Sequence, residues 1–204
     1  AMPVYELERL ENPTPQQLGM STAARFDLLA GDPGPVLDEL LVTLDNYSGQ
    51  WKDFIQELRD QGDDDEAAVS QKNLGFFLME RDRVEDGVEL LKTNPELRRC
   101  FSWMNQSMRR AVVRQGKSFE EWRLFQIGFI LTQIRGVYER CCPDGELSED
   151  HLNHAEVLWF ATGGGKTEAY LGLLVMGMLY ERMHGRYYGP TGWMRFPLRM
   201  LSVQ

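Results

Sequence analysis

The stretch Glu156-Val-Leu-Trp-Phe-Ala-Thr-Gly-Gly-Gly-Lys-Thr-Glu168 decides our prediction of the fold. Its apolar beginning, Glu156–Phe160, predicts a buried strand, and the apolar spacing after Gly165 predicts a helix over Lys166–Met183. Three consecutive glycines join the two and allow successive backbone N–H groups to turn into one hollow. The positive end of the helix faces the same hollow, which is therefore suited to a phosphate group.

The polar residues of this loop indicate which ligand it takes. Lys166 is placed to reach the β- and γ-phosphates of a nucleotide, and Thr167 offers its hydroxyl to Mg²⁺. We therefore predict ATP and Mg²⁺ as ligands, with Lys166 and Thr167 as catalytic residues. The predicted binding set is Thr162, Gly163, Gly164, Gly165, Lys166, Thr167 and Glu168. Phe160 replaces the first glycine of the strict phosphate-loop pattern, so the alternative is a glycine-rich turn with a chance Gly-Lys-Thr.

Elements on either side of the loop resemble those of superfamily 2 helicases. Pro197-Leu-Arg-Met-Leu-Ser-Val-Gln204 resembles their P-T-R-x-L-x-x-Q element, which implies that Arg199 contacts a nucleic-acid phosphate and that Gln204 supports this contact. Trp122-Arg-Leu-Phe-Gln126 resembles their L-R-x-Y-Q element. That resemblance implies that Gln126 reads the adenine edge, with Arg123 at the adenine end or in a structural pair.

A narrower resemblance covers roughly residues 80–204. The stretches Arg83–Leu91, Leu158–Gly172 and Met194–Leu201 resemble a family of large helicase-like proteins from bacterial anti-phage defence islands, which includes the helicase subunit of the DISARM system. Ala161 and Phe196-Pro197 depart from the family pattern. The resemblance implies an ATP-driven helicase or translocase on DNA that works with partner subunits.

Charge and composition limit where such a protein touches DNA. Residues 1–98 hold 21 acidic and 9 basic side chains, whereas residues 99–204 hold 10 acidic and 13 basic ones. An acidic first half argues against a nucleic-acid grip there, because phosphate binding needs lysine and arginine. No apolar run approaches the ~18 residues of a membrane span. The 3 cysteines make a poor disulfide framework, and we predict a cytoplasmic protein.

For the fold, we predict a mainly α region over residues 1–115, followed over residues 116–204 by the beginning of an α/β, RecA-like domain with an incomplete parallel sheet. Apolar spacing predicts helices over residues 36–44, 51–58 and 84–91, and another from Pro95 that buries Leu97, Phe101, Met104, Met108 and Val112. Residues 74–79 fit helix or strand. Ser118–Glu121 predicts a capping box that opens a helix with Trp122, Phe125 and Phe129 as core. Trp193–Phe196 predicts a second strand.

Some parts of a complete motor are missing from the pattern. No Asp-Glu pair follows an apolar strand, so we expect a fragment that binds nucleotide weakly and turns over no ATP. We also expect that it either self-associates through an exposed sheet edge or is poorly ordered over its last ~50 residues. Three alternatives stay open: an acidic helical module that docks partner subunits, the motor of a restriction enzyme, and a disfavoured small-molecule kinase. A zinc site of Cys141, Cys142, His151 and His154 is a further alternative, which the spacing disfavours because adjacent cysteines chelate one metal poorly.

Overall fold

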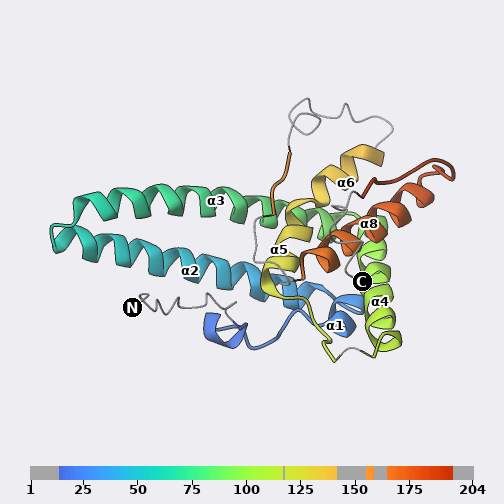
Figure 1. The fold of residues 1–204 in the computed structure, drawn as a ribbon, viewed down its shortest axis with the longest axis horizontal. Coiled ribbons are helices and arrows are strands. Elements are labelled where there is room, and N and C mark those ends of the chain that lie inside the picture. Colours follow the sequence, from blue (N-terminus) through green and yellow to red (C-terminus); the bar gives the residue numbers. More distant parts are fainter. Residues whose placement is uncertain (1–13, 117, 142–154, 159–164, 195–204) are drawn as a thin grey trace, which may run out of the picture.

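The computed structural model describes residues 14–116, 118–141, 155–158 and 165–194, and helices account for most of them. Two long antiparallel helices, α2 (Gly34–Asp60) and α3 (Asp64–Thr93), lie side by side and extend away from the remaining helices as an arm (Figure 1). The body contains the base of this arm and five further helices. These are α1 (Phe26–Ala30), α4 (Pro95–Arg114), α5 (Leu124–Thr132), α6 (Ile134–Cys141) and α8 (Lys166–Met183). A short 3₁₀ helix, η1 (Gln16–Leu18), precedes them.

Local capping explains where the arm turns and where α4 begins. Gly62 takes a left-handed φ of 79°, and the Asp63 side chain then accepts the Glu66 N–H at 3.3 Å to begin α3. Asn94 caps α4 in the same way, accepting the Leu97 N–H at 2.9 Å. The predicted helix from Pro95 is therefore confirmed. The predicted helices over 36–44 and 51–58 are parts of α2, and the segments 74–79 and 84–91 are parts of α3.

One apolar core holds the body together. It draws on α1, α4, α5 and α8 and on the base of the arm, and it includes the five α4 residues predicted to be buried. Its members lie on both sides of residue 116, and the division into segments 1–115 and 116–204 stays a prediction. A smaller cluster of Ile55, Ala67 and Leu74 joins α2 to α3 farther out along the arm. Among the described residues, none of the helices has the length and apolar character that spanning a membrane requires.

The predicted parallel sheet is wrong for the described part of the chain. Residues 155–158 and 191–194 are irregular, and the pairing found between extended segments is a single antiparallel bridge of Arg25 with Glu121. Within these described residues Val157 is 82% exposed and Trp193 is 83% exposed, whereas a central parallel strand is buried on both faces. Residues 159–160 and 195–196 of the two predicted strands lie outside the described residues. An apolar run becomes a strand only where a neighbour pairs its backbone groups. The expected self-association through a sheet edge therefore has no sheet edge to use within these residues.

The capping box predicted at Ser118–Glu121 does not open a helix, because residues 118–123 run without helical structure and α5 begins at Leu124. Long-range contacts hold this segment instead. The Phe26 N–H donates to the Glu120 carbonyl and the Trp122 N–H donates to the Ala24 carbonyl, both at 2.9 Å. The Trp122 ring is buried, as predicted for a core residue, whereas Phe125 and Phe129 are half-buried.

A candidate nucleotide-binding turn at the start of helix α8

The predicted helix Lys166–Met183 is confirmed, and its first residue follows a sharp turn at Gly165. Gly165 is the N-cap residue and takes a φ of 91°, a left-handed conformation that residues with a side chain rarely adopt. Lys166, Thr167 and Glu168 form the first turn of α8, where backbone N–H groups lack helical partners and the helix dipole is positive. Thr162, Gly163 and Gly164 lie outside the described residues.

Gln126 joins this turn to the start of α5. Its Oε1 accepts the backbone N–H of Arg123 at 2.8 Å, and its Nε2 donates to the carbonyl of Gly165 at 2.7 Å. The side chain is almost fully buried, with 5% of the residue exposed. The structure thus brings together Gln126 and the glycine-rich turn, two features that the sequence analysis had placed in one nucleotide site.

Arg123 stands beside the same turn. It is the N-cap residue of α5, and a Cβ added at Gly165 would lie 3.8 Å from its guanidinium Nη1 and 3.4 Å from Glu168 Oε2. The three predicted residues Arg123, Gln126 and Glu168 therefore surround Gly165. This arrangement puts a cation and an amide against the turn at which the phosphate hollow was predicted.

Trp122 fixes the body of α8 against α5. Its Nε1 donates to Asn105 Oδ1 at 2.7 Å, and Asn105 Nδ2 donates in turn to the Phe101 carbonyl at 2.9 Å. The outer edge of the Trp122 ring approaches Gly172 so closely that an added Cβ there would lie 2.8 Å from Cη2. A glycine at position 172 is therefore a packing requirement of the candidate site.

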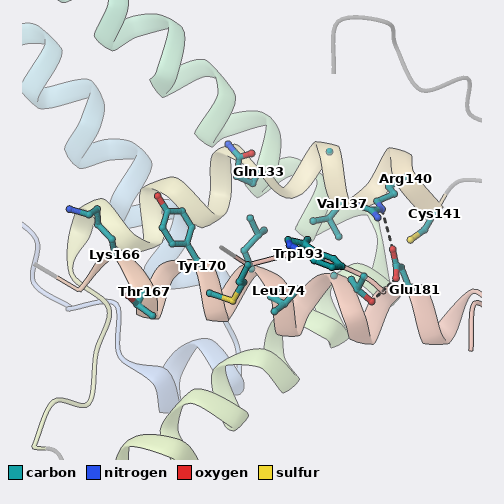
Figure 2. Close-up of a pocket in the computed structure, with 16 residues that line it drawn as sticks. Gln133, Val137, Arg140, Cys141, Lys166, Thr167, Tyr170, Leu174, Glu181 and Trp193 are labelled. Atoms are coloured by element: carbon teal, nitrogen blue, oxygen red, sulfur yellow. Dashed lines mark hydrogen bonds and ion pairs between the residues drawn. The ribbon is translucent and has the colours of Figure 1, made fainter. Parts of the chain in front are cut away.

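A groove of about 620 Å³ runs along α8 between α6 and residues 191–194 (Figure 2). Lys166, Thr167 and Tyr170 line one end, and Arg140, Cys141 and Glu181 line the other. Leu174 and Trp193 contribute to an apolar middle. A groove of this kind can take an elongated ligand that carries a charged group near Lys166.

Glu181 is a site residue that the sequence analysis did not identify. It is buried, and its carboxylate is neutralised by Arg140 at 3.1 Å and Arg186 at 3.4 Å. The Thr191 hydroxyl also donates to it at 2.7 Å, which ties residues 186–191 to α8. A clue was present in the sequence, because Glu181 follows Met176, Gly177 and Tyr180 on the apolar side of the helix.

The remaining predicted site residues fall elsewhere. Arg199 and Gln204 lie outside the described residues, as do Cys142, His151 and His154. Cys141 ends α6 and is half-buried. The described residues contain no group of three or more potential metal ligands.

Comparison with known proteins gives a partial similarity. No protein-family model matches the chain. Over 91 residues, the chain is 37% identical to the DISARM protein DrmA of Bacillus paralicheniformis (strain ATCC 9945a / NCIMB 11709 / CD-2). The aligned region covers 41% of this chain and 8% of that protein, so the chain spans less than a tenth of the curated relative. This chain is therefore similar to a small part of a DISARM protein.

Proposed function

We propose that this chain is part of an anti-phage defence protein that binds Mg·ATP at the turn before α8 and uses it in an ATP-dependent DNA helicase or translocase. The observation that carries the proposal is the coincidence of the Gly-Gly-Gly-Lys-Thr sequence with a left-handed Gly165 and a helix that begins at Lys166. The partial identity to a DISARM protein supports the defence role.

The residues of the turn fit a nucleotide with its magnesium ion. Backbone N–H groups at the start of α8 would hold phosphate oxygens, and Lys166 would supply the positive charge for the β- and γ-phosphates. The Thr167 hydroxyl would be a magnesium ligand. Thr162, Gly163 and Gly164 complete the binding set by their place in the sequence. Arg199 and Gln204 are proposed, on the same basis, to contact the DNA backbone.

Calorimetric titration tests this site directly. Mg·ADP and a non-hydrolysable Mg·ATP analogue would be titrated into the chain, into Lys166→Ala and into Lys72→Ala. We expect binding that weakens at least tenfold in Lys166→Ala and is unchanged in Lys72→Ala, which removes the same charge from an exposed position on α3. Absence of binding to the unaltered chain, or equal binding by all three proteins, would contradict the proposal.

A second candidate function, docking of partner subunits, is favoured by the outer face of the arm. Helix α3 packs one apolar stripe against α2, yet Val69, Phe76 and Met79 form another stripe at helical spacing that faces solvent. Phe76 is 57% exposed and Met79 is 65% exposed. Exposed apolar side chains that gather on one face of a helix are typical of protein–protein contacts. The arm's tip is acidic, with Asp60 and Asp63–Glu66, so a partner with basic residues around an apolar groove would fit it.

Co-expression with the other DISARM proteins of one host tests this docking role. We expect the double variant Phe76→Ser/Met79→Ser to lose a partner that the unaltered chain retains during purification. Val113→Ser is the matched control, because Val113 is exposed on α4 in the body. Equal retention by both variants would exclude the outer face of α3 as the docking surface.

A further inference from the structure

The hydrogen-bonding capacity of Gln126 is directed at the protein backbone rather than at a ligand. The resemblance to helicases implies that its amide reads adenine, which needs a donor and an acceptor side by side and accessible. In the structure its Oε1 caps α5 by accepting the Arg123 N–H, and its Nε2 donates to the Gly165 carbonyl, at 2.8 and 2.7 Å. With only 5% of the residue exposed, the amide has little surface left for a base.

Turning this amide toward a base would break both bonds. The N–H of Arg123, the N-cap residue of α5, has no helical partner, and an unpaired backbone donor is unfavourable away from water. The Gly165 carbonyl would lose its side-chain donor at the same time. The structure therefore favours the backbone contacts of Gln126 over a contact with adenine.

We propose that Gln126 is a positioning residue, which holds the Gly165 carbonyl and so sets the direction in which Lys166 and the first amides of α8 point. This inference rests on the proposed nucleotide site and assigns Gln126 a different part in it. The contact leaves no spare room, because a Cβ added at Gly165 would lie 2.6 Å from Gln126 Nε2. The turn is therefore packed directly on the amide.

A rigid base makes such positioning effective. Trp122, four residues before Gln126, is fixed from one side by Asn105 of α4 and contacts Gly172 of α8 on the other. The start of α5, from which Gln126 contacts Gly165, is thus packed against both α4 and the middle of α8. A phosphate-binding turn held in this way needs less ordering when the nucleotide binds.

The two possible roles of Gln126, positioning the turn and reading adenine, predict different losses of ligand affinity. Mg·ATP, Mg·GTP and magnesium tripolyphosphate would be titrated into the unaltered chain, Gln126→Ala and Gln126→Glu. Gln126→Glu keeps an acceptor for the Arg123 N–H but loses the donor to Gly165. For a positioning residue we expect all three ligands to weaken by a similar factor of about five to twenty in both variants. If ATP alone weakened, to the level of GTP, with tripolyphosphate unchanged, adenine reading would be established and the inference overturned.

A measurement without nucleotide separates this inference from the proposed function. Backbone hydrogen exchange over residues 169–172, the first amides of α8 with helical partners, is expected to accelerate at least fivefold in Gln126→Ala and in Gly165→Ala. Gly189→Ala is the matched control, because Gly189 also has a φ of 91° but no atom within 4 Å of an added Cβ. Unchanged exchange in Gln126→Ala would overturn the positioning role. If the unaltered chain bound none of the three ligands, the nucleotide site would fail, while the exchange result would still decide whether Gln126 orders the turn.

Discussion

Gly87 provides a strong test of how the arm joins the body. It lies in α3 directly against α5, where a Cβ would meet the Leu131 carbonyl oxygen at 2.1 Å and the Leu131 carbonyl carbon at 3.0 Å. Both atoms belong to the backbone of α5, so neither can rotate away as a flexible side chain would. Gly87→Ala must therefore move one helix relative to the other.

The size of the effect follows from two opposing terms. An ordinary van der Waals contact begins near 3.4 Å, so α3 and α5 would have to separate by roughly 1 Å at this point. Overpacking of this kind costs typically ~1–3 kcal/mol. Alanine gains back up to ~1 kcal/mol because it is the better helix former. We expect a net loss of about 1–2 kcal/mol, which at roughly 2–4 °C per kcal/mol for a chain of this size lowers Tm by about 2–8 °C.

Urea unfolding followed by far-UV circular dichroism, together with calorimetry, measures this loss. Gly75→Ala is the matched control, because Gly75 lies in the same helix with no atom within 4 Å of an added Cβ. That variant should be more stable than the unaltered chain by up to ~1 kcal/mol. The two substitutions thus have opposite signs. If Gly87→Ala stabilised the chain as Gly75→Ala does, α3 and α5 would not pack as described.

Two further predictions concern buried groups of the body. Trp122→Phe leaves the buried Asn105 Oδ1 without its donor and opens space beside Gly172. We therefore expect the free energy of unfolding, measured in the same urea assay, to fall by roughly 2–3 kcal/mol. The control Trp103→Phe, on the exposed side of α4, should lower it by less than ~0.5 kcal/mol. Burial raises the pKa of the Cys100 thiol from 9.0 to about 11. The native state therefore keeps this proton where the unfolded chain releases it, and stability falls as the pH rises from about 9 to about 11. Cys100→Ala should remove that part of the slope in urea titrations at pH 8, 9, 10 and 11, and an unchanged slope would contradict the burial of the thiol.

Elements with strong local signals were predictable from the sequence. The helix Lys166–Met183 begins after a glycine run and ends before Gly185, so its bounds are decided by residues close to its ends. Helix α4 starts at an Asn-Pro cap and keeps one apolar stripe, and its five predicted core residues are buried. In both helices, one face meets one core along most of the length.

Prediction was weaker where a helix changes partner along its length. Helix α3 packs against α2 through Ala67 and Leu74 in the outer arm, then contacts the body core through Val84, Val88 and Leu91. The exposed apolar residues on its outer face, Val69, Phe76 and Met79, form a second apolar pattern in the sequence of the same helix. The sequence therefore suggested separate short segments, with residues 74–79 open to either structure, whereas the backbone continues as one helix from Asp64 to Thr93.

The predicted strands were wrong for a related reason. The apolar residues of Glu156–Phe160 fit a buried strand, but a strand is defined by its neighbours, and local pattern does not supply them. In the described part, Glu156 instead pairs with Arg83 of α3, and Leu158 lines a pocket between α2, α3 and α5. An apolar segment that lies against helices carries the same residue types as one that lies in a sheet.

Gln126 shows that a residue type can indicate where a site lies, whereas the role of that residue becomes clear only from the fold. An amide three residues after an N-cap position is a local signal, and the Arg123–Gln126 spacing already contained it. The contact with Gly165 spans 39 positions and depends on how α5 and α8 pack through Trp122 and Gly172. Resemblance assigned this amide to adenine because the type of residue suits that edge. The bonds in the structure assign it to the turn, where this buried amide serves two backbone groups and presents little surface to a base.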